Sequence, residues 1–403
     1  MAHDHGITQA LQKHVDAGSL AGVVTGVWRK GTLVHSAAVG IADLETQAPM
    51  QLDMVFRVAS MTKPITAVAA LLLMEEGRFA LEDPITRWAP EFSSMRVLRS
   101  PTGPLDETQP AQRPITFEDL FTHRAGFTYG PFHAGPIAKA LEDALGGDID
   151  SHVTPENWIK ALASLPLVQQ PGVALHYGHA TDLLGLLLAR MEDAPLGEVL
   201  QRRVFGPLGM VDTGFTVPSS KRGRRAGLVG FNSSGALLAL KKGPGGSTVE
   251  ERPEGMTFVS GGQGLWSTLA DYGRFAQLFA GGNTLLRPET LALMTTNRLT
   301  PAQRARSDVG GARLFEKGHG FGLGVAVVTE PDKAMAALCG GGVGSVGWPG
   351  GFGSWWQADP NNQTVMGLLC HNLVEREQFD QGIGFAVYEA IAQFQTRASL
   401  LTT

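Results

Sequence analysis

The sequence predicts an α/β protein of the α+β kind, in which an antiparallel sheet flanked by helices carries an inserted all-helical domain. Strand signatures occur within residues 20–40 and again within 321–370, whereas helical spacing dominates the region between them. Strands that are separated by a long insertion can still pair in one sheet. We therefore expect residues 1–84 and 285–403 to form the sheet domain and residues 85–284 to form a mainly helical domain. Clefts between such domains are common ligand sites, so we expect the functional site there.

The first elements follow from local patterns. Residues 6–18 have amphipathic helical spacing, and residues 21–43 read as a hairpin that turns at Lys30-Gly31. Residues 64–76 form the most apolar predicted helix, because its apolar side chains recur at helical intervals.

The middle of the chain is punctuated by helix signals. Thr116 and Asp119 stand at the spacing of a capping box, with Asp in place of the usual Glu, and predict a helix start. Further helices are predicted over 182–191, 196–204 and 269–279, while residues 219–256 are rich in Gly, Ser, Lys and Arg and suggest a long surface excursion. Towards the end, short strands are predicted over 321–328, 335–339, 354–358 and 364–370, followed by a helix over 379–396.

Composition narrows the class of function. Apolar residues make up 43% and charged residues 18%, and the net charge of −5 is spread along the chain without a basic stripe, so we expect no nucleic-acid partner. No apolar run reaches the roughly 20 residues that a membrane helix needs, and the N-terminus lacks a secretory pattern, so we expect no membrane association and a cytoplasmic location. Cys339 and Cys370 read as packed thiols, and no metal-ligand spacing occurs, so we expect no metal and no cofactor.

The sharpest chemical signal is Ser60-x-x-Lys63 at the start of the apolar helix. Residues three apart share a helix face, so the hydroxyl and the amine can meet. The positive end of the helix dipole and burial both favour a neutral amine that accepts the serine proton. The alternative is a helix-capping serine followed by a solvated lysine. Two observations favour the catalytic interpretation, since this Ser-x-x-Lys occurs once in the chain and the helix is too apolar to be a surface helix.

At this point the chain resembles the serine β-lactamase-like superfamily, which has the fold of class C β-lactamases and penicillin-binding proteins and includes family VIII carboxylesterases. The resemblance covers about residues 20–390. Its segments in this sequence are FRVASMTKPITAVAALLLMEEGRFALEDPI, PITFEDLFTHRAGF, PGVALHYGHATDLLGLLLARM, VFGPLGMVDTGF and GGQGLWSTLADYGRF.

The resemblance implies roles for further residues. Tyr177 stands at the tyrosine of the Tyr-x-Asn motif and is the implied proton shuttle beside Lys63, while His179 replaces the asparagine. The Lys-Thr-Gly motif of the β-lactamases is replaced by Trp348-Pro349-Gly350-Gly351, similar to the Trp-x-Gly motif of family VIII esterases. Tryptophan offers an apolar wall and one N–H donor, so the replacement favours neutral esters over carboxylate-bearing substrates.

By the same resemblance, the backbone N–H groups of Ser60 and Gly351 are the implied oxyanion hole. The implied substrate contacts are Trp348, His179, Gly350 and Phe127. His123 is expected to be structural, and Arg57 and Asp182 are expected to serve charge pairing.

Together these features predict a serine carboxylic-ester hydrolase that acts on small, short-chain esters through an acyl-enzyme. The sequence leaves three alternatives open, namely acyl transfer to an alcohol, a weak β-lactamase or D-alanyl-D-alanine peptidase-like activity, and a non-catalytic binding protein. It also leaves open whether Lys63 or Tyr177 is the resting base. No Gly-x-Ser-x-Gly occurs, which disfavours an α/β-hydrolase triad.

Overall fold

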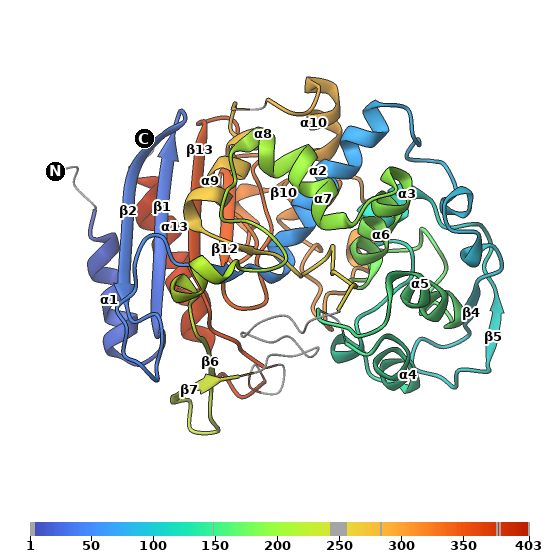
Figure 1. Ribbon diagram of the computed structural model, residues 1–403, viewed down its shortest axis with the longest axis horizontal. Helices are drawn as coiled ribbons and strands as arrows, with labels where there is room; N and C mark the ends of the chain where they lie inside the picture. Colours follow the sequence, from blue (N-terminus) through green and yellow to red (C-terminus); the bar gives the residue numbers. More distant parts are fainter. Residues whose placement is uncertain are drawn as a thin grey trace.

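The computed structural model describes residues 5–147, 149–241, 256–282, 284–375, 378 and 380–401 of the protein. Its centre is a seven-stranded antiparallel sheet that joins both ends of the chain, which confirms the predicted sheet (Figure 1). From one edge to the other the strands are β2 (Thr32–Gly40), β1 (Gly22–Arg29), β13 (Thr364–Cys370), β12 (Trp355–Asp359), β11 (Val346–Gly347), β10 (Ala326–Val328) and β9 (His319–Phe321).

Both faces of this sheet are covered because its strands carry apolar side chains on both sides. In β1, Val23 and Val27 belong to one buried cluster and Val24 belongs to another, as the two-residue repeat of a strand requires. The first cluster includes α1 (Ile7–Asp16) and α13 (Phe385–Ser399), which pack against each other. The second includes α2 (Thr62–Glu75) and α9 (Leu269–Ala276). The sheet therefore lies between two helical layers.

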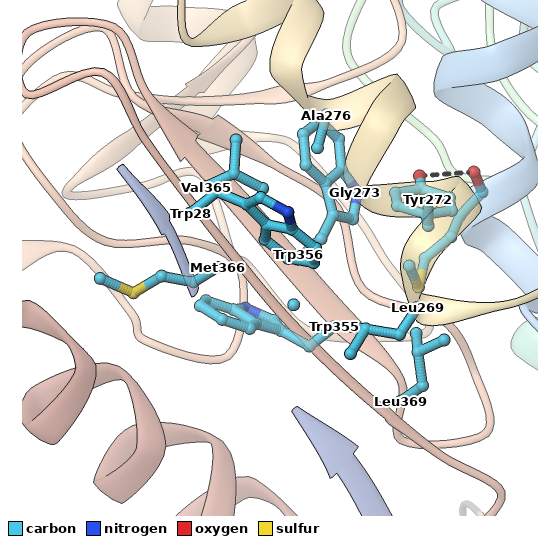
Figure 2. Close-up of a pocket in the computed structure, with 12 residues that line it drawn as sticks. Trp28, Leu269, Tyr272, Gly273, Ala276, Trp355, Trp356, Val365, Met366 and Leu369 are labelled. Atoms are coloured by element: carbon cyan, nitrogen blue, oxygen red, sulfur yellow. Dashed lines mark hydrogen bonds between the residues drawn. The ribbon is translucent and has the colours of Figure 1, made fainter. Parts of the chain in front are cut away.

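Helix α9 packs on β1, β12 and β13, although the domain boundaries predicted from the sequence assign it to the helical part. A cavity of about 10 Å³ lies beneath it, lined among others by Trp28, Tyr272 and Trp356 (Figure 2). This volume holds about one water molecule, so the cavity is no substrate site. The Tyr272 hydroxyl donates to the Met61 carbonyl at 2.8 Å, and the dashed line at Tyr272 in Figure 2 marks this bond. Helix α9 is thereby tied to the segment that carries Ser60.

The helical part packs against α2, which lies between the sheet and this part in Figure 1. Eleven of the residues in α2 are buried, because it contacts α6 and α7 on the side away from the sheet. The other α-helices of the middle region are α3 (Phe117–Phe121), α4 (Pro136–Leu145), α5 (Pro155–Ser164), α6 (Ala180–Glu192), α7 (Leu196–Leu200) and α8 (Gly206–Leu208). Helices α10 (Pro288–Met294) and α11 (Pro301–Ala305) follow α9.

Three short strand pairs complete the fold. They are β3 (Phe56–Arg57) with β8 (Trp266–Ser267), β4 (Arg96–Leu98) with β5 (Thr108–Pro110), and β6 (Leu228–Phe231) with β7 (Leu237–Leu240). The capping box that was predicted at Thr116 and Asp119 is present at the start of α3. Both cysteines are buried free thiols, as predicted, and burial raises the pKa of the Cys370 thiol to about 12.

The structure corrects four predicted elements. The strand predicted over 321–328 is a hairpin, β9 and β10, because the chain reverses at Gly322–Val325 with Gly324 at φ +88°. Residues 335–339 form turns instead of a strand. The last helix begins at 385, after Gly384 at φ +80°, and the predicted start at residue 379 lies outside the described residues.

The fourth correction concerns the predicted surface excursion over 219–256. Its residues 228–231 are buried in β6, which also bridges to Asn372, so this stretch belongs to the packed fold. Residues 242–255 of the excursion lie outside the described residues. Within the part of the chain that the structure describes, no helix has both the length and the apolar character needed to cross a membrane.

Candidate active site

Ser60 lies where a short strand turns directly into α2, a helix in which eleven residues are buried. Strand β3 ends at Arg57, a 3-10 turn spans Ala59–Met61, and α2 begins at Thr62. Ala59 adopts φ +45°, which few residues other than glycine adopt, and such strain is found where the surrounding structure fixes the backbone. Ser60 therefore stands at the N-terminal end of α2, where the helix dipole favours negative charge.

Two polar side chains converge on the Ser60 oxygen. The Lys63 Nζ lies 3.3 Å from Ser60 Oγ, and the Tyr177 hydroxyl donates to the same oxygen at 2.8 Å. The Lys63 Nζ also donates to the Gly262 carbonyl at 2.9 Å. Ser60 is 7% exposed, Tyr177 is 4% exposed and Lys63 is fully buried. The structure thus brings the three residues that the sequence predicts as catalytic into one buried contact. We call Ser60, Lys63, Tyr177 and Trp348 together the Ser60 site.

Tyr177 is held from two sides. It precedes α6, and its backbone N–H donates to the Asp308 carbonyl at 3.0 Å. The Trp348 Nε1–H donates to the Tyr177 hydroxyl oxygen at 3.1 Å. Burial raises the pKa of Tyr177 above its ordinary value, although its hydrogen bonds with Ser60 and Trp348 act in the opposite direction. Tyr177 is therefore a neutral phenol that can give a proton to a bound group.

The loop after β11 carries Trp348, Gly350 and Gly351, and it meets the Ser60 region at two points, since Trp348 contacts Tyr177 and Gly350 approaches Val58. A Cβ on Gly350 would lie 2.5 Å from the Val58 carbonyl oxygen, so only glycine allows this close approach. A Cβ on Gly351 would meet nothing within 4 Å. Neither the Ser60 nor the Gly351 N–H donates a hydrogen bond to any of the residues that the structure describes. Both N–H groups are thus available to an oxyanion.

Two predicted substrate contacts, His179 and Phe127, are buried side chains. His179 is fully buried, its Nδ1 lies 3.2 Å from Asp182 Oδ2, and its ring packs edge-on against Tyr129 at 4.5 Å. Phe127 is buried in the large core cluster, where its ring packs against Phe92 at 5.9 Å. His179 turns inward because the carboxylate one helical turn later accepts its N–H. Both rings are thus packed against protein side chains, and their substrate contacts stay a prediction.

Other side chains surround Tyr177. The His123 ring lies 4.8 Å from it, and the pKa of His123 lies well below its ordinary value because of burial and the positive charge of Lys63. His123 is thus a neutral wall residue. Phe132 stacks on Tyr177 with 6.1 Å between ring centroids and is 38% exposed, so it can contact an incoming substrate. Arg57, expected to pair a charge, forms a buried ion pair with Asp150 at 2.8 Å.

The partner that sequence reasoning missed is Gly262. It contributes a backbone carbonyl to Lys63, and every residue has such a carbonyl, so no side-chain pattern could have indicated it. No cluster of three or more His, Cys, Asp or Glu side chains able to hold a metal ion occurs within the described ranges.

The chain is similar to known proteins over most of its length. The family model described as Beta-lactamase matches residues 7–386. Protein Rv1367c of Mycobacterium tuberculosis is 43% identical over 90% of this chain and 88% of its own, and Esterase EstB of Burkholderia gladioli is 32% identical over 84% and 83%. Among solved structures, "EstCE1, a hydrolase with promiscuous acyltransferase activity" is similar with a TM-score of 0.75 and 25% identity, covering 95% of this chain and 97% of that one.

Proposed function

Since this chain belongs to the Beta-lactamase family, we propose that it is a carboxylic-ester hydrolase with Ser60 as nucleophile, Lys63 as base and Tyr177 as proton donor. The observation that carries the proposal is the convergence of the Lys63 amine and the Tyr177 hydroxyl on Ser60 Oγ, at 3.3 and 2.8 Å. A nucleophile within hydrogen-bond reach of a base is the geometry that activates a serine. The similarity to Esterase EstB supports the choice of esters as substrates.

Acylation needs only Ser60, Lys63, Tyr177 and two backbone N–H groups. Neutral Lys63 takes the proton of Ser60 as Oγ attacks the ester carbonyl, and the carbonyl π electrons move onto oxygen. The N–H groups of Ser60 and Gly351 bind this oxyanion. When the tetrahedral intermediate collapses, Tyr177 gives its proton to the departing alkoxide, and the proton on Lys63 then restores the phenol. The alcohol leaves and the acyl group remains on Ser60.

Deacylation repeats these steps with water as the nucleophile. The Lys63–Tyr177 pair takes a proton from water as its oxygen attacks the acyl carbonyl, and the same N–H groups bind the second oxyanion. Collapse breaks the bond to Ser60 Oγ, which regains a proton, and the carboxylic acid leaves. No group outside the Ser60 site is needed for the proton balance.

Trp348 supports esters over β-lactams. A cation at this position would attract the carboxylate of a β-lactam, but the indole carries no charge, and its one N–H is directed at Tyr177. The ring packs between Phe315 and Phe321, at 6.2 and 5.3 Å between centroids. This surface favours a neutral, apolar acyl or alcohol group.

Acyl transfer is the second candidate, because the structurally similar EstCE1 is a hydrolase with promiscuous acyltransferase activity. It differs from hydrolysis only in the last nucleophile, because an acceptor alcohol replaces water at the acyl-enzyme. A product analysis with added alcohol separates the two reactions.

The test is hydrolysis of p-nitrophenyl esters from acetate to decanoate, beside a chromogenic cephalosporin, by the wild type, Ser60→Ala and Ser94→Ala. Ser94 is exposed and serves as the matched control. We expect short esters to be cleaved, Ser60→Ala to lose at least about a thousandfold in kcat/KM, and Ser94→Ala to equal the wild type. A fluorophosphonate should phosphonylate Ser60 Oγ with loss of HF, so that the Ser60 peptide gains the mass of the phosphonyl group. Preference for the cephalosporin, or an active Ser60→Ala, would refute the proposal.

A further inference from the structure

Asp182 is a fully buried carboxylate surrounded by donors. Its Oδ1 accepts from the Gly262 backbone N–H at 3.0 Å and from the Ser260 hydroxyl. Its Oδ2 accepts from the Tyr129 hydroxyl at 3.0 Å and lies 3.2 Å from His179 Nδ1. A carboxylate that receives several hydrogen bonds is held in one orientation and favoured as an anion.

The groups that Asp182 holds are the groups that hold Lys63. The Gly262 N–H donates to the Asp182 carboxylate, and the Gly262 carbonyl accepts from Lys63 Nζ at 2.9 Å. Tyr129 gives its hydroxyl to the carboxylate, and its ring centroid lies 5.2 Å from the same Nζ. A Cβ on Gly262 would lie 2.9 Å from both Asp182 Oδ1 and the Tyr129 hydroxyl, so the space around Gly262 admits no side chain without a shift of these groups.

Helix α2 forms hydrogen bonds with the other side of the loop that contains Gly262. The Thr66 hydroxyl donates to the Gly261 carbonyl at 2.7 Å, and the Leu265 N–H donates to the Thr62 hydroxyl at 3.1 Å. The loop over 260–265 is therefore clamped between Asp182 on α6 and the polar face of α2. A change at Asp182 would be transmitted through this loop to the amine.

Asp182 also acts on Lys63 through its charge. Burial alone would raise the pKa of Asp182, but His179, Lys63 and Ser260 hold it below its ordinary value, and its place in the first turn of α6 favours the anion as well. The charge of Lys63 is among the interactions that lower this pKa, so the two charges interact. In a buried site such an interaction is only weakly screened.

We propose that Asp182 is a positioning residue for Lys63, whose carboxylate fixes the Gly262 carbonyl and the Tyr129 ring against the amine and whose charge sets the pH range in which Lys63 accepts the Ser60 proton. This inference rests on the proposed role of Lys63 as base. The titratable groups that face Lys63 are Tyr177, Tyr129, His123 and Asp182, and His179 faces Asp182. Asp182 supplies the negative charge in this set.

The experiment compares pH profiles of kcat and kcat/KM on p-nitrophenyl acetate for the wild type, Asp182→Asn and Gly262→Ala. Removing the negative charge lets the Lys63 ammonium release its proton at lower pH, so the acid limb of Asp182→Asn should move down by about one pH unit. Its plateau kcat should fall roughly ten- to hundredfold because the loop is less well held, with KM within about twofold of the wild type. Gly262→Ala displaces the carbonyl without changing a charge, so it should lower kcat and leave the limb in place.

Asp271→Asn is the matched control. Asp271 is also a buried carboxylate at the third residue of its helix, α9, but it accepts from the Asp212 N–H, Thr213 and Arg274. We expect Asp271→Asn to lower the stability of the protein and to leave the acid limb of the pH profile in place. An unmoved limb in folded Asp182→Asn would overturn the charge role, and a wild-type kcat in Gly262→Ala would overturn the positioning role even if Asp182→Asn does not fold. Active Ser60→Ala or Lys63→Met variants would instead refute the proposed function itself.

Discussion

Two buried regions of this protein are built on opposite principles. Between the sheet and α13, Trp355, Met366, Ile391 and Phe394 pack side chain against side chain, and the strands beneath them are joined by backbone hydrogen bonds. The Ser60 site is also buried, yet it holds an amine, two hydroxyls and an indole N–H. Its parts come from Ser60 before α2, Tyr177 before α6 and Trp348 after β11.

The difference shows what each region supplies. Apolar contacts stabilise in proportion to the area that they remove from water, whatever their exact direction. The polar contacts of the Ser60 site depend on direction and add little net stability, because each replaces a hydrogen bond to water. We therefore expect changes in the sheet layer to lower stability and spare activity, and changes at the Ser60 site to do the reverse.

Lys63→Met should give the largest effect. Methionine has a similar length but cannot accept a proton, so kcat/KM on p-nitrophenyl acetate should fall at least about a thousandfold. The melting temperature should stay at or above the wild-type value, because a buried polar amine is replaced by an apolar side chain of similar length. Lys139→Met, at an exposed lysine of α4, controls for the loss of a positive charge and should leave both quantities unchanged. A Lys63→Met protein that melts far below the wild type would contradict the comparison.

Phe394→Ala addresses the other region. Phe394 is buried on α13, with its ring 6.3 Å from Trp355, so the truncation leaves a cavity and should cost about 3–5 kcal/mol of unfolding free energy. The kcat per folded molecule should be unchanged. Urea unfolding and active-site titration measure the two quantities.

Phe385→Ala, on the same helix but 45% exposed, is the control and should cost less than about 1 kcal/mol. A large loss of kcat in folded Phe394→Ala would mean that the sheet layer also positions the Ser60 site.

The same contrast separates what the sequence could predict from what it could not. Strands and amphipathic or apolar helices leave a periodic pattern of side chains in the sequence. The first hairpin, β13 and α2 were therefore predicted closely. The hairpin of β9 and β10 was read as one strand, because a turn at glycines within an apolar run interrupts no pattern.

At the Ser60 site, Ser60 and Lys63 were paired by their local spacing, whereas Tyr177 came from a motif resemblance. The inward turn of His179 depends on Asp182, and the contact of Lys63 with Gly262 depends on a loop 199 residues away, so tertiary structure alone reveals them. Phe127, predicted as a substrate contact, lies in the core cluster, because an aromatic near a motif fits the core as readily as a substrate pocket.

Trp348→Phe should give the smallest of these effects and makes the sharpest comparison, because Trp355→Phe is its matched partner in the sheet layer. Both indoles are buried, but Trp348 Nε1 donates to the Tyr177 hydroxyl, whereas Trp355 Nε1 has no acceptor among the described residues. Without its Trp348 donor Tyr177 is less firmly oriented and its anion less stabilised during proton transfer, so kcat should fall roughly tenfold with KM little changed. Trp355→Phe should keep the wild-type kcat and lose only stability. Steady-state kinetics on p-nitrophenyl acetate measures kcat for both variants. If Trp348→Phe and Trp355→Phe had equal kcat values, the N–H contact of Trp348 would contribute nothing to the reaction.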